Sequence, residues 1–323
     1  MPRVSVVIPT YNVASFLAIT LDSVLGQTLK DIEVILWDDG SRDATLEVAE
    51  AYAAKDPRVK VARGNHGGVS VARNGGFSLI HPSSEFVTFF DSDDVWEPDA
   101  LESLVKALEA HPEAPAAHAL CRAIDPQGVQ FPHDDHAQRM RERLAVVGDE
   151  IVPIPPTAPT SFGALLIKNY VTTPGTSLMR RSALARVGLY DTSLPVCEDW
   201  DLNLRLARLG DFVFIDRILL SWRRHPGSVS NVSKNWRKSY VRARERSIHA
   251  PENSAAQKHA AVVALRHEVR GLQGEALKFL RAGAFGPAIK KLARSLALAR
   301  VEWFGRGQTG PQATSFSRPV SDA

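Results

Sequence analysis

The segment VSVVIPTYN, residues 4–12, begins the pattern that decides the fold. Its first seven residues are rich in β-branched side chains and predict a buried strand over Val4–Thr10. The next segment, SFLAITLDSVLGQT, predicts a helix that Ser15 caps and Gly26 ends. The apolar face of that helix comprises Phe16, Leu17, Thr20, Leu21, Val24 and Leu25. A strand followed at once by an amphipathic helix is the start of a βαβ unit.

The same alternation recurs as far as about residue 115. IEVILWDD predicts a strand ending at Asp38–Asp39, and a helix follows between a Ser41 cap and Pro57. VKVARG and FVTFF predict two more strands, with the helical segments VSVARNGGFSLI and EPDALESLVKALEAHP after them. We therefore expect an α/β fold with a mostly parallel, Rossmann-like sheet flanked by helices. Ligands of such sheets bind beyond the carboxyl ends of the strands.

The alternation weakens in the second part of the chain. AAHALCRAI predicts a strand, residues 131–160 read as a long loop, and DFVFIDRILLSW predicts another strand. From about residue 231 the composition shifts to Ala, Arg and Lys, with two helical apolar stripes separated by AGAFGP. We expect one α/β domain over 1–230, with halves at 1–115 and 116–230, a helical extension over 231–305 and a disordered tail over 306–323.

Charge is unevenly distributed along the 323 residues, whose formal net charge is +3. After residue 230 there are 17 Lys and Arg against 6 Asp and Glu, about +11, which leaves about −8 for the rest. The first two thirds are therefore not expected to bind a polyanion such as nucleic acid. Two cysteines, no leader pattern and no long apolar run favour a cytoplasmic protein without a membrane span.

Three carboxylates crowd the end of the strand in FVTFFDSDD, residues 86–94. Asp91, Asp93 and Asp94 repel one another unless a partner relieves the charge. Mg²⁺ prefers oxygen ligands and takes one or two carboxylates together with substrate phosphates. Taken alone, the Asp-x-Asp favours the simpler interpretation, a solvated turn that caps the next helix, because such triplets are common by chance.

At other predicted strand and helix ends, each polar side chain has both a structural and a functional interpretation. Asp39 is either a turn residue in DDGS or an acceptor for a nucleobase N–H or ribose hydroxyl. Arg73, between glycines, either forms a surface ion pair or holds a base or diphosphate. Glu198 and Asp199 either suit a helix start or supply a general base. His225 is either an exposed loop residue or a ligand of phosphate or metal.

Taken in order, eight segments resemble the blocks of glycosyltransferase family 2, the inverting enzymes with a GT-A fold that use nucleotide sugars. The segments are VSVVIPTYN, LDSVLGQT, EVILWDDGSRDAT, GGVSVARNGG, FFDSDD, GTSLMRRSALARVGLYDTSL, EDWDLNLRLA and RRHPGSVS. They run from about residue 3 to 230, so the resemblance implies a catalytic domain over 1–230 with a nucleotide-binding half over 1–115 and an acceptor half over 116–230. Ser84 stands where the family usually has glycine before the glutamate, so we expect a local change of turn.

The resemblance implies a role for each matching position. The nucleotide sugar is expected to contact Pro9, Thr10, Tyr11, Asp39, Gly68, Arg73, Asp91, Ser92 and Asp93. Asp39 would bind the nucleobase, which favours uracil. Mg²⁺ or Mn²⁺ is expected on Asp91, Asp93, Asp94 and His225, with the choice among the three aspartates open. Asp199 is expected to be the base, and Glu198, Gly175 and Thr176 to lie near the acceptor.

The implied activity is the inverting transfer of a sugar, expected to be UDP-linked, to an acceptor hydroxyl in cell-surface polysaccharide or glycoconjugate synthesis. One alternative is a non-catalytic nucleotide-sugar-binding or scaffold protein, but neither the Asp-x-Asp nor the base is degraded. Another is a nucleotidyltransferase, but PTYNVASF stands where a Gly-rich basic loop would follow the first strand.

The basic helical tail lies outside the resemblance. It would contact the membrane surface peripherally, near a glycan or lipid-linked acceptor on the inner face, or pack as a hairpin or dimer seam. The alternating three and four spacing of its apolar residues favours packing.

Overall fold

The computed structural model describes residues 1–228 and 236–304. The chain divides into two compact units, Met1–His267 and Glu268–Ala323. The expected disorder of residues 306–323 therefore concerns a segment outside the described residues.

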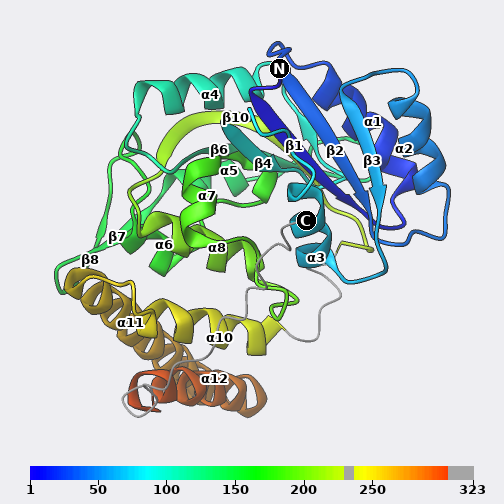
Figure 1. Ribbon diagram of the computed structural model, residues 1–323. Helices are drawn as coiled ribbons and strands as arrows, with labels where there is room; N and C mark the ends of the chain where they lie inside the picture. Colours follow the sequence, from blue (N-terminus) through cyan, green and yellow to red (C-terminus); the bar gives the residue numbers. More distant parts are fainter. Residues whose placement is uncertain (229–235, 305–323) are drawn as a thin grey trace, which may run out of the picture. The chain divides into compact units, whose positions relative to one another are not determined.

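The first unit is built on an eight-stranded, mostly parallel sheet, as predicted from the alternation of strands and helices (Figure 1). In sheet order the strands are β3 (Val59–Arg63), β2 (Ile32–Asp38), β1 (Val4–Thr10), β4 (Phe86–Phe89), β9 (Ser177–Arg180), β6 (Ala116–Ile124), β10 (Val213–Arg223) and β5 (Val95–Trp96). Strand β9 runs antiparallel to β4 and β6, and β5 runs antiparallel to β10. From β1 the strands are added on one side as far as β3, and β4 is then added on the other side of β1. The topological switch point therefore lies beside β1, and α/β sheets bind their ligands at such a point.

Helices cover both faces of this sheet. In chain order they are α1 (Ala14–Leu25), α2 (Thr45–Ala53), α3 (Val69–Phe77), α4 (Ala100–Ala110), α5 (His136–Arg141), α6 (Phe162–Ile167), α7 (Arg181–Val187) and α8 (Glu198–Ala207). Helix α10 (Trp236–His249) packs against α8. Figure 1 shows α1 and α2 beside the β1–β3 end of the sheet and α6 to α8 near the other end.

The two faces of β1 follow from the two-residue period of a strand. Val6 and Ile8 belong to the core cluster that contains Leu17 and Leu21 of α1. Val7 faces the other way and packs against α3, where a Cβ on Gly76 would lie only 2.5 Å from the Val7 Cγ1 atom. The glycine lets α3 approach the sheet closely, and this approach brings its residue Arg73 under the strand ends.

Several local predictions differ from the structure. Ser15 lies inside α1 rather than capping it, although Gly26 does end the helix. Ser41 does not cap α2, which begins at Thr45, because its hydroxyl accepts a hydrogen bond from the Asn12 N–H instead. Residues 131–160 are not one long loop: they contain α5 and a separate hairpin of β7 (Leu144–Val147) and β8 (Glu150–Pro153).

The second unit contains the end of α11 (Ala255–Arg281) and α12 (Phe285–Phe304). The break falls in the AGAFGP segment, as predicted, with Gly283 at a φ of 72°. Within 1–228 and 236–304, no helix combines the length and the apolar character that a membrane crossing needs.

Candidate functional site

Three adjacent parallel strands end at one edge of the sheet. The register pairs Thr10 of β1 with Asp38 of β2, and Val7 of β1 with Phe89 of β4. Residues that follow these strand ends, Asp39 and Asp91 among them, therefore lie on one rim. Pro9 and Thr10 are buried at the end of β1, and Tyr11 beyond them is exposed.

Asp39 organises the β2 side of this rim. Its carboxylate accepts hydrogen bonds from the backbone N–H groups of Gly67 (2.9 Å) and Gly68 (2.8 Å). Gly68 has a φ of 88°, a conformation that favours glycine, so the chain turns sharply into α3. The Oδ1 atom, which accepts from Gly67, has a second lone pair that can accept from an incoming donor.

A pocket of about 530 Å³ opens beside Asp39. Its lining consists of Gly40, Arg63, Gly64, Asn65 and His66. The His66 ring stacks on Tyr11 at a centroid distance of 4.2 Å, and its Nδ1 atom lies 3.2 Å from the Asp39 carboxylate. The lining offers the His66 imidazole and the Arg63 guanidinium, with the Asp39 carboxylate behind His66, and such groups are suited to a nucleobase and its ribose.

Arg73 joins the two halves of the site. Its side chain is almost completely buried and donates to the Asp91 carboxylate (2.7 Å) after β4 and to the Glu198 carboxylate (2.7 Å) at the start of α8. The guanidinium also lies over the Tyr190 ring, 4.9 Å from its centroid. The sequence left open an ion pair or a contact with a base or diphosphate for Arg73, and the structure shows two buried ion pairs that join the two acidic segments.

The three aspartates of FFDSDD have different surroundings. The Asp93 Oδ2 atom lies 2.8 Å from the His225 Nε2 atom. Burial and the negative charge of Asp91 raise the Asp93 pKa. Asp94 is fully buried and accepts from the Arg223 N–H (3.0 Å). Burial and the charges of its two neighbours raise the Asp94 pKa well above its usual value.

Thr173 was missed by sequence reasoning and lies between these carboxyl groups. Its hydroxyl is 3.2 Å from both the Asp91 and the Asp94 carboxyl oxygens. Gly175 and Thr176, expected near the acceptor, are buried beneath it, and the Thr176 hydroxyl donates to the Thr173 carbonyl. Ser92 is partly buried, and its carbonyl accepts from Thr20.

The donor set suits a divalent cation that is completed by substrate. No group of three or more His, Cys, Asp or Glu side chains among the described residues is arranged to hold a metal ion unaided. Mg²⁺ and related ions commonly use one or two carboxylates and take their remaining oxygens from phosphate and water. Asp91, Asp93 and His225 fit such an open site, and the raised Asp93 pKa marks crowding that a cation would relieve. Asp94 fits it less well because its oxygens are already engaged inside the protein.

Asp199 lies one residue beyond Glu198 in the first turn of α8, after Cys197 in the left-handed conformation. Burial and the adjacent Glu198 charge raise the Asp199 pKa to about 7, even though Arg73 acts in the opposite direction. A carboxylate with this pKa can take up a proton near neutral pH, as a general base must.

Two asparagines that sequence reasoning missed orient Asp199. The Asn169 amide donates to the Asp199 Oδ2 atom at 2.9 Å, and the buried Asn203 donates to the Asn169 Oδ1 atom at 3.2 Å. The second bond fixes the Asn169 amide with its NH₂ group toward the carboxylate. Asn203 was recognisable, since it lies one helical turn after Asp199, but the segment around Asn169 carried no signal.

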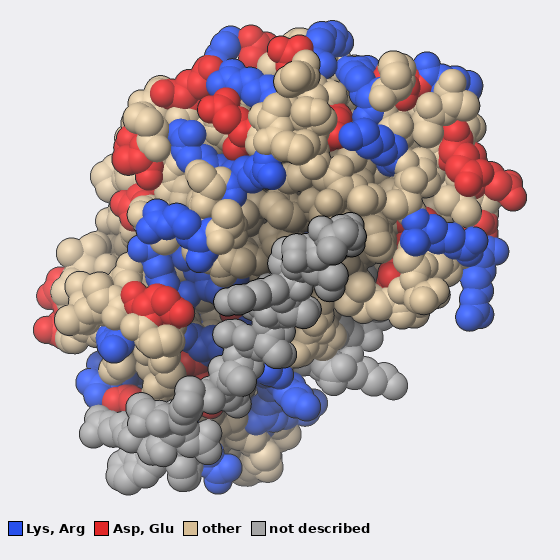
Figure 2. Space-filling view, in the orientation of Figure 1, with Lys and Arg blue, Asp and Glu red and all other residues tan. Residues whose placement is uncertain are grey.

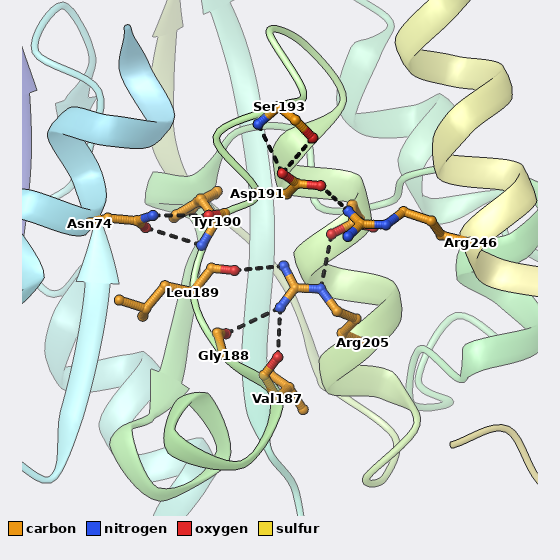
Figure 3. Close-up of polar contacts among 10 residues, drawn as sticks. Asn74, Val187, Gly188, Leu189, Tyr190, Asp191, Ser193, Arg205 and Arg246 are labelled. Atoms are coloured by element: carbon orange, nitrogen blue, oxygen red, sulfur yellow. Dashed lines mark hydrogen bonds and ion pairs between the residues drawn. The ribbon is translucent and has the colours of Figure 1, made fainter. Parts of the chain in front are cut away.

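The Val187–Asp191 segment, which supplies Tyr190 beneath Arg73, is held from three helices (Figure 3). Asn74 of α3 exchanges two hydrogen bonds with the Tyr190 backbone, 2.9 and 3.1 Å long. Arg205 of α8 donates to three successive carbonyls of the segment and to Asp201. Arg246 of α10 pairs with Asp191. The surroundings of Arg73 are therefore set by α3, α8 and α10 together.

The family model "Glycosyl transferase family 2" matches residues 5–188. Among curated proteins, the glycosyltransferase GlyA of Streptococcus pneumoniae is 26% identical over 281 residues, which are 85% of this chain and 38% of GlyA. The chain thus spans well under half the length of that relative.

Solved structures share the fold. TarS 1–349 of S. aureus, in complex with UDP-GlcNAc, gives a TM-score of 0.66 at 20% identity, covering 94% of this chain and 83% of that one. A mannosyltransferase from Pyrobaculum calidifontis, in complex with GDP-Man and Mn²⁺, gives 0.55 at 19% identity, covering 96% and 88%. These likenesses confirm the expected GT-A fold. Because the family model covers more than half of its length, this chain belongs to glycosyl transferase family 2.

Proposed function

We propose that the protein is an inverting glycosyltransferase that moves a sugar from a nucleoside-diphosphate donor, preferably UDP-linked, to an acceptor hydroxyl. The observation that carries the proposal is the position of Arg73, which bonds at 2.7 Å both to Asp91 and to Glu198, the neighbour of Asp199. These contacts support a single site in which the acidic cluster would bind the diphosphate and Asp199 would act as the base. The S. aureus neighbour bound to UDP-GlcNAc supports the choice of donor class.

Each part of the donor has residues suited to it. We propose that the nucleobase enters the pocket beside Asp39 and lies against Tyr11. Asp91, Asp93 and His225 would hold Mg²⁺ or Mn²⁺, as suggested by the neighbour bound to GDP-Man and Mn²⁺. When bound, the cation would neutralise charge that develops on the leaving diphosphate. We assign Asp94 to positioning β10 through the Arg223 N–H rather than to the ion.

The acceptor side is assigned to Asp199. In its charged form it takes the proton from the attacking hydroxyl, while Asn169 occupies its Oδ2 atom and leaves Oδ1 for that proton. Attack from the face opposite the diphosphate inverts the anomeric carbon in one displacement. We propose a glycan or lipid-linked acceptor and a role in polysaccharide or glycoconjugate synthesis.

A donor screen tests the proposal. The melting temperature would be measured with UDP-, GDP- and dTDP-sugars, each with and without Mn²⁺, and release of the corresponding nucleoside diphosphate would be followed for every donor that binds. We expect a UDP-sugar to raise the melting temperature in the presence of Mn²⁺ and to be turned over. Asp93→Ala should keep the fold and lose both the Mn²⁺-dependent shift and turnover. Full activity of Asp93→Ala, or no stabilisation by any nucleotide sugar, would contradict the assignment.

A further inference from the structure

One helix of the second unit exposes an unusual row of large apolar side chains. Phe285, Ile289, Leu292 and Leu296 of α12 are 65, 63, 39 and 63% exposed. Their spacing of four, three and four residues places them on one side of the helix. A different side of α12 packs inside the protein, since Ala288 and Leu298 are fully buried. We call the four exposed residues the α12 stripe.

The exposed apolar surface is concentrated there. Of the 14 exposed large hydrophobic side chains in the described part of the chain, six fall within residues 277–296. Leu277 and Leu280 at the end of α11 are the other two. Contiguous exposed apolar surface marks an interaction site, whereas scattered single residues need no explanation.

The charges around the stripe are mostly positive. Residues 268–304 contain 7 Lys and Arg and 3 Glu. Glu268 pairs with Arg294 at 2.8 Å and Glu275 pairs with Lys291. Five further cationic side chains are exposed, namely Arg270, Lys278, Arg281, Lys290 and Arg300. Figure 2 shows more blue than red where Figure 1 draws α10 to α12.

We propose that the α12 stripe, with these exposed cations, docks on a lipid surface that carries anionic headgroups. An interfacial helix combines an apolar face with Lys and Arg, and it binds through buried apolar area and attraction to anionic lipid. Each Lys or Arg near such a surface strengthens binding roughly fivefold. A second copy of the chain is the less suitable occupant, because it would bring two positively charged units together.

This docking concerns a surface of the second unit and does not depend on the proposed sugar transfer. Binding to vesicles can therefore be measured without donor or acceptor, and its failure would leave the transfer proposal untouched. The apolar stripe supplies depth of insertion, whereas the cations supply a dependence on lipid charge and on salt.

The test is co-sedimentation of the full chain with vesicles of phosphatidylcholine and phosphatidylglycerol at a ratio of about 1:1, and with phosphatidylcholine alone. The stripe variant is Ile289→Glu/Leu296→Glu. The matched control is Ile19→Glu/Leu79→Glu, which makes the same charge change at two exposed apolar side chains of the first unit, 51 and 43% exposed. Because all four positions are exposed, both variants should fold, which circular dichroism would check.

We expect the wild type to bind the anionic vesicles at least about tenfold more tightly than the neutral ones. The stripe variant should bind anionic vesicles at least about tenfold more weakly than the wild type, and the control within about twofold of it. Absence of wild-type binding, or equal weakening by the stripe variant and the control, would overturn the proposal. So would a wild-type dimer in sedimentation velocity that only the stripe variant dissociates, since the stripe would then belong to a second copy.

Discussion

Replacing Asn169 by leucine should move the pH dependence of the reaction without removing the catalytic carboxylate. Leucine is close to asparagine in size but cannot donate to the Asp199 Oδ2 atom, which the wild-type amide approaches to 2.9 Å. That bond stabilises the charged form of Asp199 and so lowers its pKa. Burial and the Glu198 charge raise this pKa, and without the bond less remains to counteract them. The Asp199 pKa must therefore rise.

The size of the shift follows from the bond. A hydrogen bond to a charged group contributes about 1.5–3 kcal/mol, which corresponds to about 1–2 pKa units. The Asp199 pKa should move from about 7 to roughly 8–9. Since only the carboxylate accepts the proton, activity is lost as pH falls through this pKa, and the variant should be about 5- to 50-fold slower at pH 7.

The assay is UDP release at saturating donor between about pH 6 and pH 10, with Asn203→Leu as a graded companion. Asn203 acts only through Asn169, so its variant should shift the acid limb in the same direction by a smaller amount. Recovery of the Asn169→Leu rate to within about twofold of wild type at high pH supports the account. A rate lowered equally at every pH, with an unmoved acid limb, would refute the role of Asn169 in tuning the base.

Two further predictions concern the buried charges. Arg73→Met should lower the free energy of unfolding in urea by about 3–5 kcal/mol, because Asp91 and Glu198 lose their shared cation, and an unchanged midpoint would contradict this. His225→Ala removes the partner of Asp93 at 2.8 Å, so the Mn²⁺ concentration for half-maximal UDP release should rise about tenfold or more. An unaltered Mn²⁺ titration would exclude His225 from the metal site.

The parallel part of the fold was predictable because local pattern and long-range pairing agree there. Val4–Thr10 is β-branched and buried on both faces, and it lies between two parallel partners in the sheet. The hairpin of β7 and β8 was not predictable in this way. Its strands are only four residues long and pair only with each other, and β8 ends at Pro153, which reads as loop.

The candidate site likewise contains residues whose positions the sequence could predict and residues whose positions it could not. Asp39, Asp91 and Asp93 stand directly after predicted strands, and the carboxyl ends of parallel strands meet at one edge of a sheet, so their positions in the sequence suffice to place them together. Arg73 was singled out, but its two carboxylate partners could not be predicted, because they come from segments 18 and 125 residues away. Thr173 and Asn169 belong to irregular backbone, where no period relates a residue to its neighbours in space.

The prediction that Ser41 caps a helix was wrong for a physical reason as well. A serine before an apolar run is a good cap only when its hydroxyl is free to turn back to its own helix. The Ser41 hydroxyl instead binds the Asn12 N–H, which ties the turn after β1 to the turn after β2. At this position the hydrogen bond between the two turns of the rim takes the place of a helix cap.

The most direct test of the account is a comparison of donor binding and donor turnover in Asp199→Asn. The amide keeps the shape of the side chain but cannot accept the proton, so UDP-sugar should bind within about twofold of wild type in the presence of Mn²⁺. The rate of UDP release should fall by about 10²–10⁴-fold over the whole pH range. Turnover of Asp199→Asn at the wild-type rate would contradict the account, because the group in the first turn of α8 would then not be the base.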